Sequence, residues 1–212
     1  MKAKTLSLAA LLFSAVFASQ SQAALVYNGG ASTSSGGYYA DQGYTYTETG
    51  AHFMLNSASA VNSIKWWGAY DGNQNQTDNF FLRFYAGGAT PGALLYSFNL
   101  GASNKTATGN VMLNAWNEYS YQSAFSAFNL AANTSYFISL SNQNSGSDNW
   151  FWANGNGPSN NGASYGGSWL NTGASLAFEL SNDTATQAVS APATLGLFGL
   201  SLLALGLRRR QR

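Results

Sequence analysis

Apolar and polar residues alternate along several short stretches in the middle of the chain. In residues 80–85, Phe-Phe-Leu-Arg-Phe-Tyr, every second residue is large and apolar. Residues 136–141 and 176–180 repeat this period of two. The period is typical of a strand that is buried on one side only. Further candidate strands are 44–49, 61–70, 94–100, 111–116, 118–128 and 150–153.

Breaks rich in glycine and asparagine separate these stretches, for example at residues 71–73 and 154–158. No stretch has the apolar period of an amphipathic helix. Many short strands with such breaks are typical of an antiparallel sandwich or barrel. We therefore predict an all-β fold, an antiparallel and jelly-roll-like β-sandwich, over residues 24–188.

The N-terminus has the pattern of a secretory signal peptide over residues 1–23. Lys2 and Lys4 precede an apolar run over 6–18, which is too short to span a bilayer comfortably. Ser21 and Ala23 then form a small-x-small site, so we expect cleavage by signal peptidase after Ala23. A retained membrane anchor is the alternative.

The C-terminus, residues 189–212, has a second apolar segment that ends in basic residues. The segment from Ala193 to Leu207 carries no charge and would be about 22 Å long as a helix. Positive charge after it is expected to stay in the cytoplasm. The domain would then face outward from the inner membrane, in agreement with the N-terminal signal.

This tail resembles a PEP-CTERM sorting signal, also catalogued as the ice-binding protein C-terminal domain. The resemblance rests on a short proline motif, a Gly/Leu helix and an arginine-rich end; the matching positions are Pro192, Ala193, Thr194, Leu195, Arg208, Arg209 and Arg210. The glutamate of the family's usual Pro-Glu-Pro is here Ala191. The resemblance implies a Gram-negative bacterium that makes exopolysaccharide, and an exosortase-type enzyme as partner.

The middle of the chain resembles an uncharacterised β-sandwich domain found ahead of such tails. The resemblance rests on residues 64–72, 81–85, 91–95 and 150–153. It implies the fold class and no particular chemistry.

Charge excludes one class of partner. Between the two ends there are three basic residues, Lys65, Arg83 and Lys105, against all eight acidic residues of the chain, which gives this part a net charge of −5. Such a domain cannot neutralise a run of phosphates, so we expect no nucleic-acid binding.

The sequence lacks the motifs of common hydrolases. The single histidine, His52, lies within 51–55 at a position that suits a strand, where a structural role is expected, and no Gly-x-Ser-x-Gly elbow is present. Glu48, Glu118 and Glu179 are scattered rather than arranged as a glycosidase pair. We predict that the protein is not an enzyme; a secreted hydrolase is a weaker alternative.

One loop spaces oxygen ligands as a calcium site does. Asp71, Asn73 and Asp78 are the candidate ligands, because Ca²⁺ takes six to eight oxygens. The loop lacks the glycine and the bidentate glutamate of an EF-hand. A polar turn between two strands is the other interpretation, and we expect no obligatory cofactor.

Tryptophan residues are the candidate ligand-binding groups. Trp66 and Trp67 are adjacent, so on a strand one points into the core and the other away from it. The exposed face of an indole stacks on a sugar ring, whereas buried indoles pack the core. The candidates for an exposed platform are Trp67, Trp150, Trp152 and Trp169.

These observations predict a noncatalytic protein that is exported, held in the membrane by its tail and associated with exopolysaccharide at the cell surface or in the matrix. A structural or adhesive matrix protein without a ligand pocket is the first alternative. Ice binding is a further one, although only residues 44–49 resemble a threonine ladder.

Overall fold

The structure is a computed structural model of the chain. It describes residues 23–42, 47–72, 76–88, 90–143, 148–157, 161–165, 168–171 and 173–183. The chain divides into a compact unit, Ala23–Thr184, and a second unit made of its two ends. All the described residues belong to the first unit.

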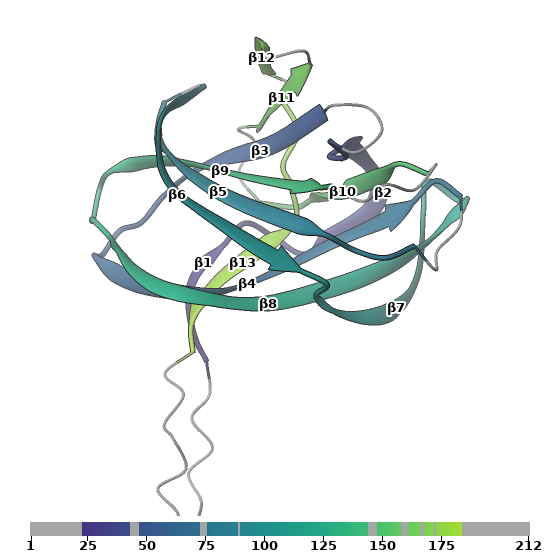
Figure 1. The fold of residues 1–212 in the computed structure, drawn as a ribbon, viewed down its shortest axis with the longest axis horizontal. Helices are drawn as coiled ribbons and strands as arrows, with labels where there is room; N and C mark the ends of the chain where they lie inside the picture. Colours follow the sequence, from purple (N-terminus) through teal and green to yellow (C-terminus); the bar gives the residue numbers. More distant parts are fainter. Residues whose placement is uncertain are drawn as a thin grey trace, which may run out of the picture. The chain divides into compact units, whose positions relative to one another are not determined.

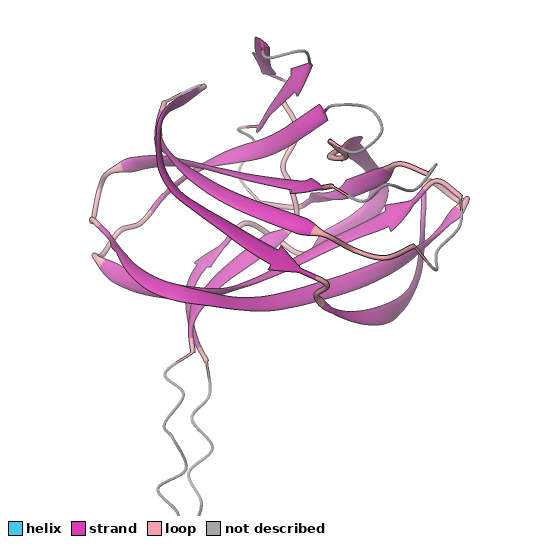
Figure 2. Cartoon of the chain, viewed as in Figure 1, coloured by secondary structure: helices cyan, strands magenta, loops and turns pink. Residues whose placement is uncertain are grey.

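The described part is built from strands and loops (Figure 2). The strands are β1 Ala24–Asn28, β2 Ser32–Tyr39, β3 Thr47–Met54, β4 Ser59–Tyr70, β5 Phe80–Gly87, β6 Pro91–Gly101, β7 Asn104–Met112, β8 Trp116–Leu130, β9 Ser135–Asn142, β10 Trp150–Gly155, β11 Asn161–Tyr165, β12 Ser168–Asn171 and β13 Phe178–Asn182. Among the described residues there is no helix that could span a bilayer. The predicted signal peptide and tail helix lie outside these residues.

The strands form two antiparallel sheets that pack face to face (Figure 1). Sheet A contains β1, β13, β4, β10, β2, β8 and β7, and sheet B has the order β12-β11-β3-β9-β5-β6. Strand β4 is central in sheet A, because β8 pairs with one edge and β13 and β10 share the other.

Eight strands follow the path of a jelly roll. Their order is β1-β13-β4-β8 in sheet A and β3-β9-β5-β6 in sheet B. Along the chain, each of these strands lies in the other sheet from the one before it, except that β6 follows β5 in sheet B. This arrangement confirms the predicted jelly-roll-like β-sandwich.

Alternation of side chains produces the core between the sheets. Ile64 and Trp66 of β4 point inward, as do Phe80, Leu82 and Phe84 of β5, and all five are fully buried. The indole of Trp66 stacks on Tyr121 with ring centroids 5.6 Å apart. Burial of such rings is the main source of stability in a domain without disulfides.

A second, smaller apolar cluster covers part of the outer face of sheet A. It consists of Ala69, Met112, Phe151, Ala153 and Ala177, with Tyr39, Trp67 and Trp116 packed against it. The ring of Trp116 stacks on Phe151 at 5.0 Å. Strand β10 is therefore apolar on both faces.

One predicted strand is wrong. Residues 113–115 form a turn between β7 and β8, and Leu113 and Asn114 have φ angles of 53° and 56°. The apolar residues of 111–116 belong to the end of β7 and the start of β8 rather than to one strand. Residues 44–46 of the predicted strand 44–49 lie outside the described part.

The two ends of the compact unit lie side by side. Strand β1 pairs with β13, and Ala24 faces Asn182. Just beyond β13, the side chain of Asn62 accepts a hydrogen bond from Asp183 N at 2.7 Å and donates one to Asp183 O at 2.9 Å. These two bonds extend the β4–β13 pairing by one more residue.

Candidate functional site

The outer face of sheet A presents the partly exposed Trp67 among polar side chains. In the register of the sheet, Lys65 of β4 lies opposite Gln122 of β8 and Glu179 of β13, and Trp67 lies opposite Ser120 of β8. Residues opposite each other in an antiparallel pair share a face. We call these five residues, Lys65, Trp67, Ser120, Gln122 and Glu179, the Trp67 patch.

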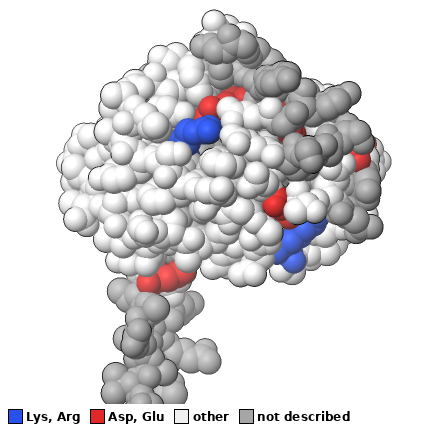
Figure 3. Space-filling view, viewed as in Figure 1, with Lys and Arg blue, Asp and Glu red and all other residues white. Residues whose placement is uncertain are grey.

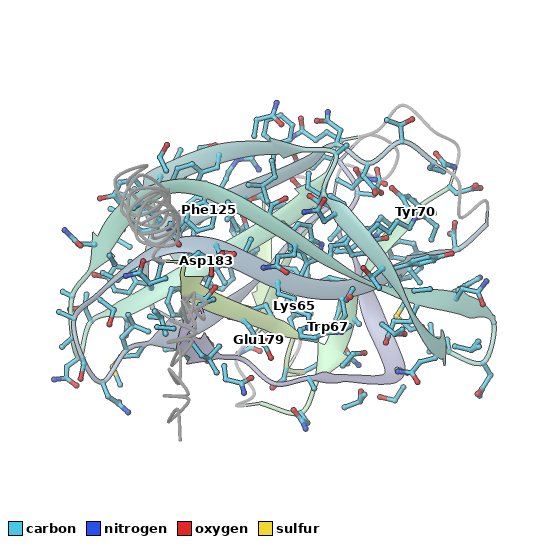
Figure 4. All side chains as sticks on the ribbon, turned by 90° about the horizontal axis from the view of Figure 1, so that it is seen from below. Lys65, Trp67, Tyr70, Phe125, Glu179 and Asp183 are labelled. Carbon is cyan, nitrogen blue, oxygen red and sulfur yellow. The ribbon has the colours of Figure 1, made fainter. Side chains whose placement is uncertain are left out.

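The indole of Trp67 is partly exposed, whereas its neighbour Trp66 is fully buried. One side of the Trp67 ring packs on the small apolar cluster, and the Nζ of Lys65 lies 4.8 Å from the ring centroid. Figure 4 shows Lys65, Trp67 and Glu179 close together on this face. The apolar cluster and the Lys65 ammonium therefore both contact the ring, and part of its surface reaches solvent.

The polar groups of the patch keep hydrogen-bonding capacity for a ligand. Within the described part of the chain, neither Lys65 nor Glu179 forms an ion pair, although they are register partners. The ammonium and Gln122 supply donors, and the carboxylate and the Gln122 oxygen supply acceptors. An indole bordered by such groups can stack on the apolar face of a sugar ring while they bind its hydroxyl groups.

Trp150 and Trp152 are not surface platforms. Both are 0% exposed and belong to the main core. The residue between them, Phe151, points outward into the small cluster. The interpretation of this pair as ligand-binding was wrong, because the outward face of β10 is apolar as well and alternation does not reveal which face is the core.

Trp169 lies on the opposite side of the domain from Trp67. It belongs to β12, is partly exposed and packs its ring edge-on against Phe137 of β9, with centroids 5.0 Å apart. Tyr85 of β5 lies 6.5 Å from it in the same geometry. The two predicted platforms that reach solvent, Trp67 and Trp169, are therefore on different sheets.

The two described carboxylates of the predicted calcium loop, Asp71 and Asp78, bind different protein groups. The carboxylate of Asp71 accepts hydrogen bonds from Asn149 N and Nδ2 at 2.9 and 2.8 Å, and that of Asp78 accepts one from the Tyr70 hydroxyl at 2.7 Å. Burial raises the pKa of Asp78, and the bond from Tyr70 and the charge of Lys105 oppose this rise. Asn73 lies outside the described residues, among which no three His, Cys, Asp or Glu side chains are grouped for a metal.

The targeting residues fall mostly outside the described part. This applies to Ser21 and to the sorting residues Pro192, Ala193, Thr194, Leu195, Arg208, Arg209 and Arg210. Ala23 is exposed, and β1 begins at the next residue, Ala24.

Two carboxylate networks, around the buried Glu118 and the partly exposed Glu48, were missed by the sequence analysis. Glu118 is 1% exposed and accepts hydrogen bonds from four side chains, those of Ser32, Ser34, Thr108 and Asn110. Glu48 forms a second network with Arg83, Tyr85, Ser139 and Gln42. Ser32 and Ser34 lie 86 and 84 residues from Glu118, and Ser139 lies 91 residues from Glu48, so no local signal points to these contacts.

An open groove of about 730 Å³ lies between β1 and the β3–β4 connection. It is lined by residues 24–28, 54–60 and 182, and none of these is a carboxylate, a histidine or a cation. The groove therefore offers no acid–base chemistry.

No protein-family model matches the chain, and a search of curated proteins finds no match. The geometry of the two sheet faces is therefore the basis for a functional proposal.

Proposed function

We propose that this protein is an exported, noncatalytic component of the cell envelope or extracellular matrix, and that it binds a neutral exopolysaccharide through the Trp67 patch. The observation that carries the proposal is the partly exposed indole of Trp67, which lies among polar side chains on the outer face of sheet A. The N-terminal signal and the tail that resembles a PEP-CTERM signal support export and membrane attachment.

Charge favours a neutral polymer over an anionic one. The part between the two ends carries three basic and eight acidic residues. Within the patch, Lys65 and Glu179 balance each other. The hydroxyl groups of a neutral polysaccharide need both hydrogen-bond donors and acceptors, which the patch supplies. The carboxylates of an anionic polysaccharide would be repelled by the net negative charge of the domain.

Affinity for one sugar unit is expected to be weak. Stacking on one ring contributes about 1 kcal/mol, and a single small site corresponds to roughly millimolar binding. Retention in a matrix then depends on many contacts along one polymer. Such a site suits a matrix component better than a transport or signalling protein.

The test uses residues 24–188, because Ala23–Thr184 forms a compact unit with its own core. The fragment is passed over exopolysaccharide from the producing strain, amorphous cellulose, chitin and mannan, each immobilised. We expect Trp67→Ala to reduce retention roughly five- to tenfold, the equivalent of about 1 kcal/mol, and Trp67→Phe to restore most of it.

Leu95→Ala is the matched control, because it removes a side chain that is 42% exposed on β6, outside the patch. It should bind as well as the parent. If the parent binds none of the four polymers, or if Trp67→Ala binds the preferred one fully, the proposal is wrong. A structural matrix protein without a ligand site would then take its place.

A further inference from the structure

Small residues lie between Glu48 and Arg83 on the outer face of sheet B. Gly50 of β3 and Arg83 of β5 both lie opposite Ser139 of β9. A Cβ atom at Gly50 would come within 2.4 Å of the Phe137 ring and 2.3 Å of the Ile138 carbonyl oxygen, so only glycine fits there. Because these residues are small, the longer side chains of Glu48 and Arg83 can contact each other over them.

Glu48 is held in one orientation by four neighbours. Its Oε1 accepts hydrogen bonds from the hydroxyls of Ser139 and Tyr85 and lies 3.1 Å from an Arg83 nitrogen. Its Oε2 accepts a single bond, from Gln42 at 3.0 Å. A carboxylate oxygen has two lone-pair positions, so Oε2 retains capacity for one more donor.

Arg83 supplies the complementary donors. Its guanidinium approaches Glu48 through one nitrogen, and its other nitrogens have no hydrogen-bond partner among the described residues. A guanidinium carries five N–H donors in a planar fork. The side chains of Arg83 and Glu48 are 19% and 13% exposed. The Nη1 of Arg83 that faces Glu48 is buried, so the remaining guanidinium nitrogens are the donors left for a ligand. A donor and an acceptor, both partly exposed, thus stand side by side.

Aromatic rings border this pair. Tyr85 binds Glu48 directly, and Trp169 lies beside Tyr85 with its ring partly exposed. Figure 3 shows a surface with few charges, on which each of the two basic patches lies next to an acidic one. A neutral polar ligand with a flat apolar side matches this combination.

We propose that Glu48, Arg83, Tyr85 and Trp169, which we call the Arg83 site, bind a second sugar ring through two adjacent hydroxyl groups, so that one domain holds two polysaccharide chains. One hydroxyl donates to Glu48 Oε2 and its neighbour accepts from Arg83, while the ring lies against Trp169. The inference rests on the proposed function for the nature of the ligand.

Bridging follows from the position of the two sites. The Trp67 patch and the Arg83 site lie on the outer faces of sheets A and B. Packed sheets are about 10 Å apart, and outward side chains add to that distance. One straight polymer cannot lie along both faces at once, so simultaneous binding joins two chains.

Bead aggregation separates binding from bridging. Agarose beads that carry exopolysaccharide from the producing strain are mixed with residues 24–188, and both bound protein and bead clustering are measured. The parent should bind and cluster the beads. Trp67→Ala and Arg83→Gln should each bind about five- to tenfold more weakly and cluster no beads, even at concentrations that restore equal coverage.

Trp169→Ala is a second probe of the Arg83 site, since it leaves the Glu48 network intact should Arg83→Gln fail to fold. Leu95→Ala is the control, and sedimentation establishes that the parent is a monomer. A parent that does not bind overturns the proposed function itself. Three outcomes would overturn the second site alone. These are a monomeric parent that binds without clustering beads, clustering that persists in Arg83→Gln and Trp169→Ala, and clustering that requires a dimer.

Discussion

The indole nitrogen of Trp152 donates a 2.9 Å hydrogen bond to the carbonyl oxygen of Ala177 inside the sandwich. This bond joins β10 to the segment that leads into β13. Trp152→Ala should lower the free energy of unfolding by about 3–5 kcal/mol, because it leaves a large cavity. Trp152→Phe should cost about 2 kcal/mol, since it fills much of the space and leaves the carbonyl without this donor. Urea denaturation measures both, and equal stability of Trp152→Ala and Trp67→Ala would contradict the buried position.

Glu118 ties β2 to β7 and β8 through its four side-chain donors. Glu118→Ala should destabilise the domain by about 3 kcal/mol, because several buried donors lose their acceptor. Glu118→Gln should cost less, since one acceptor oxygen remains. Thermal unfolding followed by circular dichroism distinguishes the two, and a Glu118→Ala variant as stable as the parent would show that water replaces the carboxylate.

Tyr85 makes stability sensitive to alkaline pH. Burial, together with the charge of Glu48 and its hydrogen bond, raises the pKa of Tyr85 from 10.0 to about 12. The folded state therefore holds this proton more tightly than the unfolded chain, and the stabilisation is complete below pH 10 and is lost as the pH approaches 12. Tyr85→Phe should be less stable than the parent by about 1 kcal/mol at pH 7. The difference should shrink between pH 10 and 12, and a constant difference across that range would exclude Tyr85 as its source.

Calcium should not affect folding through the 71–78 loop. Asp71 and Asp78 already accept hydrogen bonds from different protein groups, so an ion would have to displace them. We expect the melting temperature to be the same in EDTA and in millimolar calcium chloride. A clear rise with calcium would reveal binding to the folded state.

Export should leave a mature protein that begins at Ala24. This residue opens β1 and faces Asn182 of β13, so cleavage after Ala23 preserves the whole strand. Mass spectrometry of envelope material should find this N-terminus, and removal of residues 190–212 should release the domain into the medium. Met1 on the exported form, or full membrane retention of the truncated protein, would contradict these expectations.

The alternation of side chains predicted the core faces of the regular strands correctly. The inward positions of β5 and β9 and the opposite directions of Trp66 and Trp67 all follow from a period of two. Strands β2 and β7 escaped prediction because they are rich in serine, threonine, glycine and asparagine. The place of β2 in the sheet comes from pairing with the distant β10, whereas β7 forms a hairpin with the next strand, β8.

The candidate sites were predictable only in part. Trp67 was found because it is a tryptophan that alternates with the inward-pointing Trp66 along one strand. Its neighbours Gln122 and Glu179 are placed beside it by the register between strands more than fifty residues apart. Arg83 and Glu48 likewise meet across β9. Register depends on the whole sandwich, so a single sequence does not specify which polar residues surround an exposed ring.

If the tail anchors the protein, the hydrogen bonds between Asn62 and Asp183 would help the domain to resist a pulling force. A polymer bound at Trp67 would pull on β4, and an anchored tail would pull on the end of β13, its direct neighbour. Such a force acts along the strands and shears the β4–β13 ladder, so its hydrogen bonds must break together rather than one after another. The two bonds between Asn62 and Asp183 stand at the point where that force would enter the sheet. They would keep the first ladder bond from peeling, and the domain would transmit tension to its tail without unfolding.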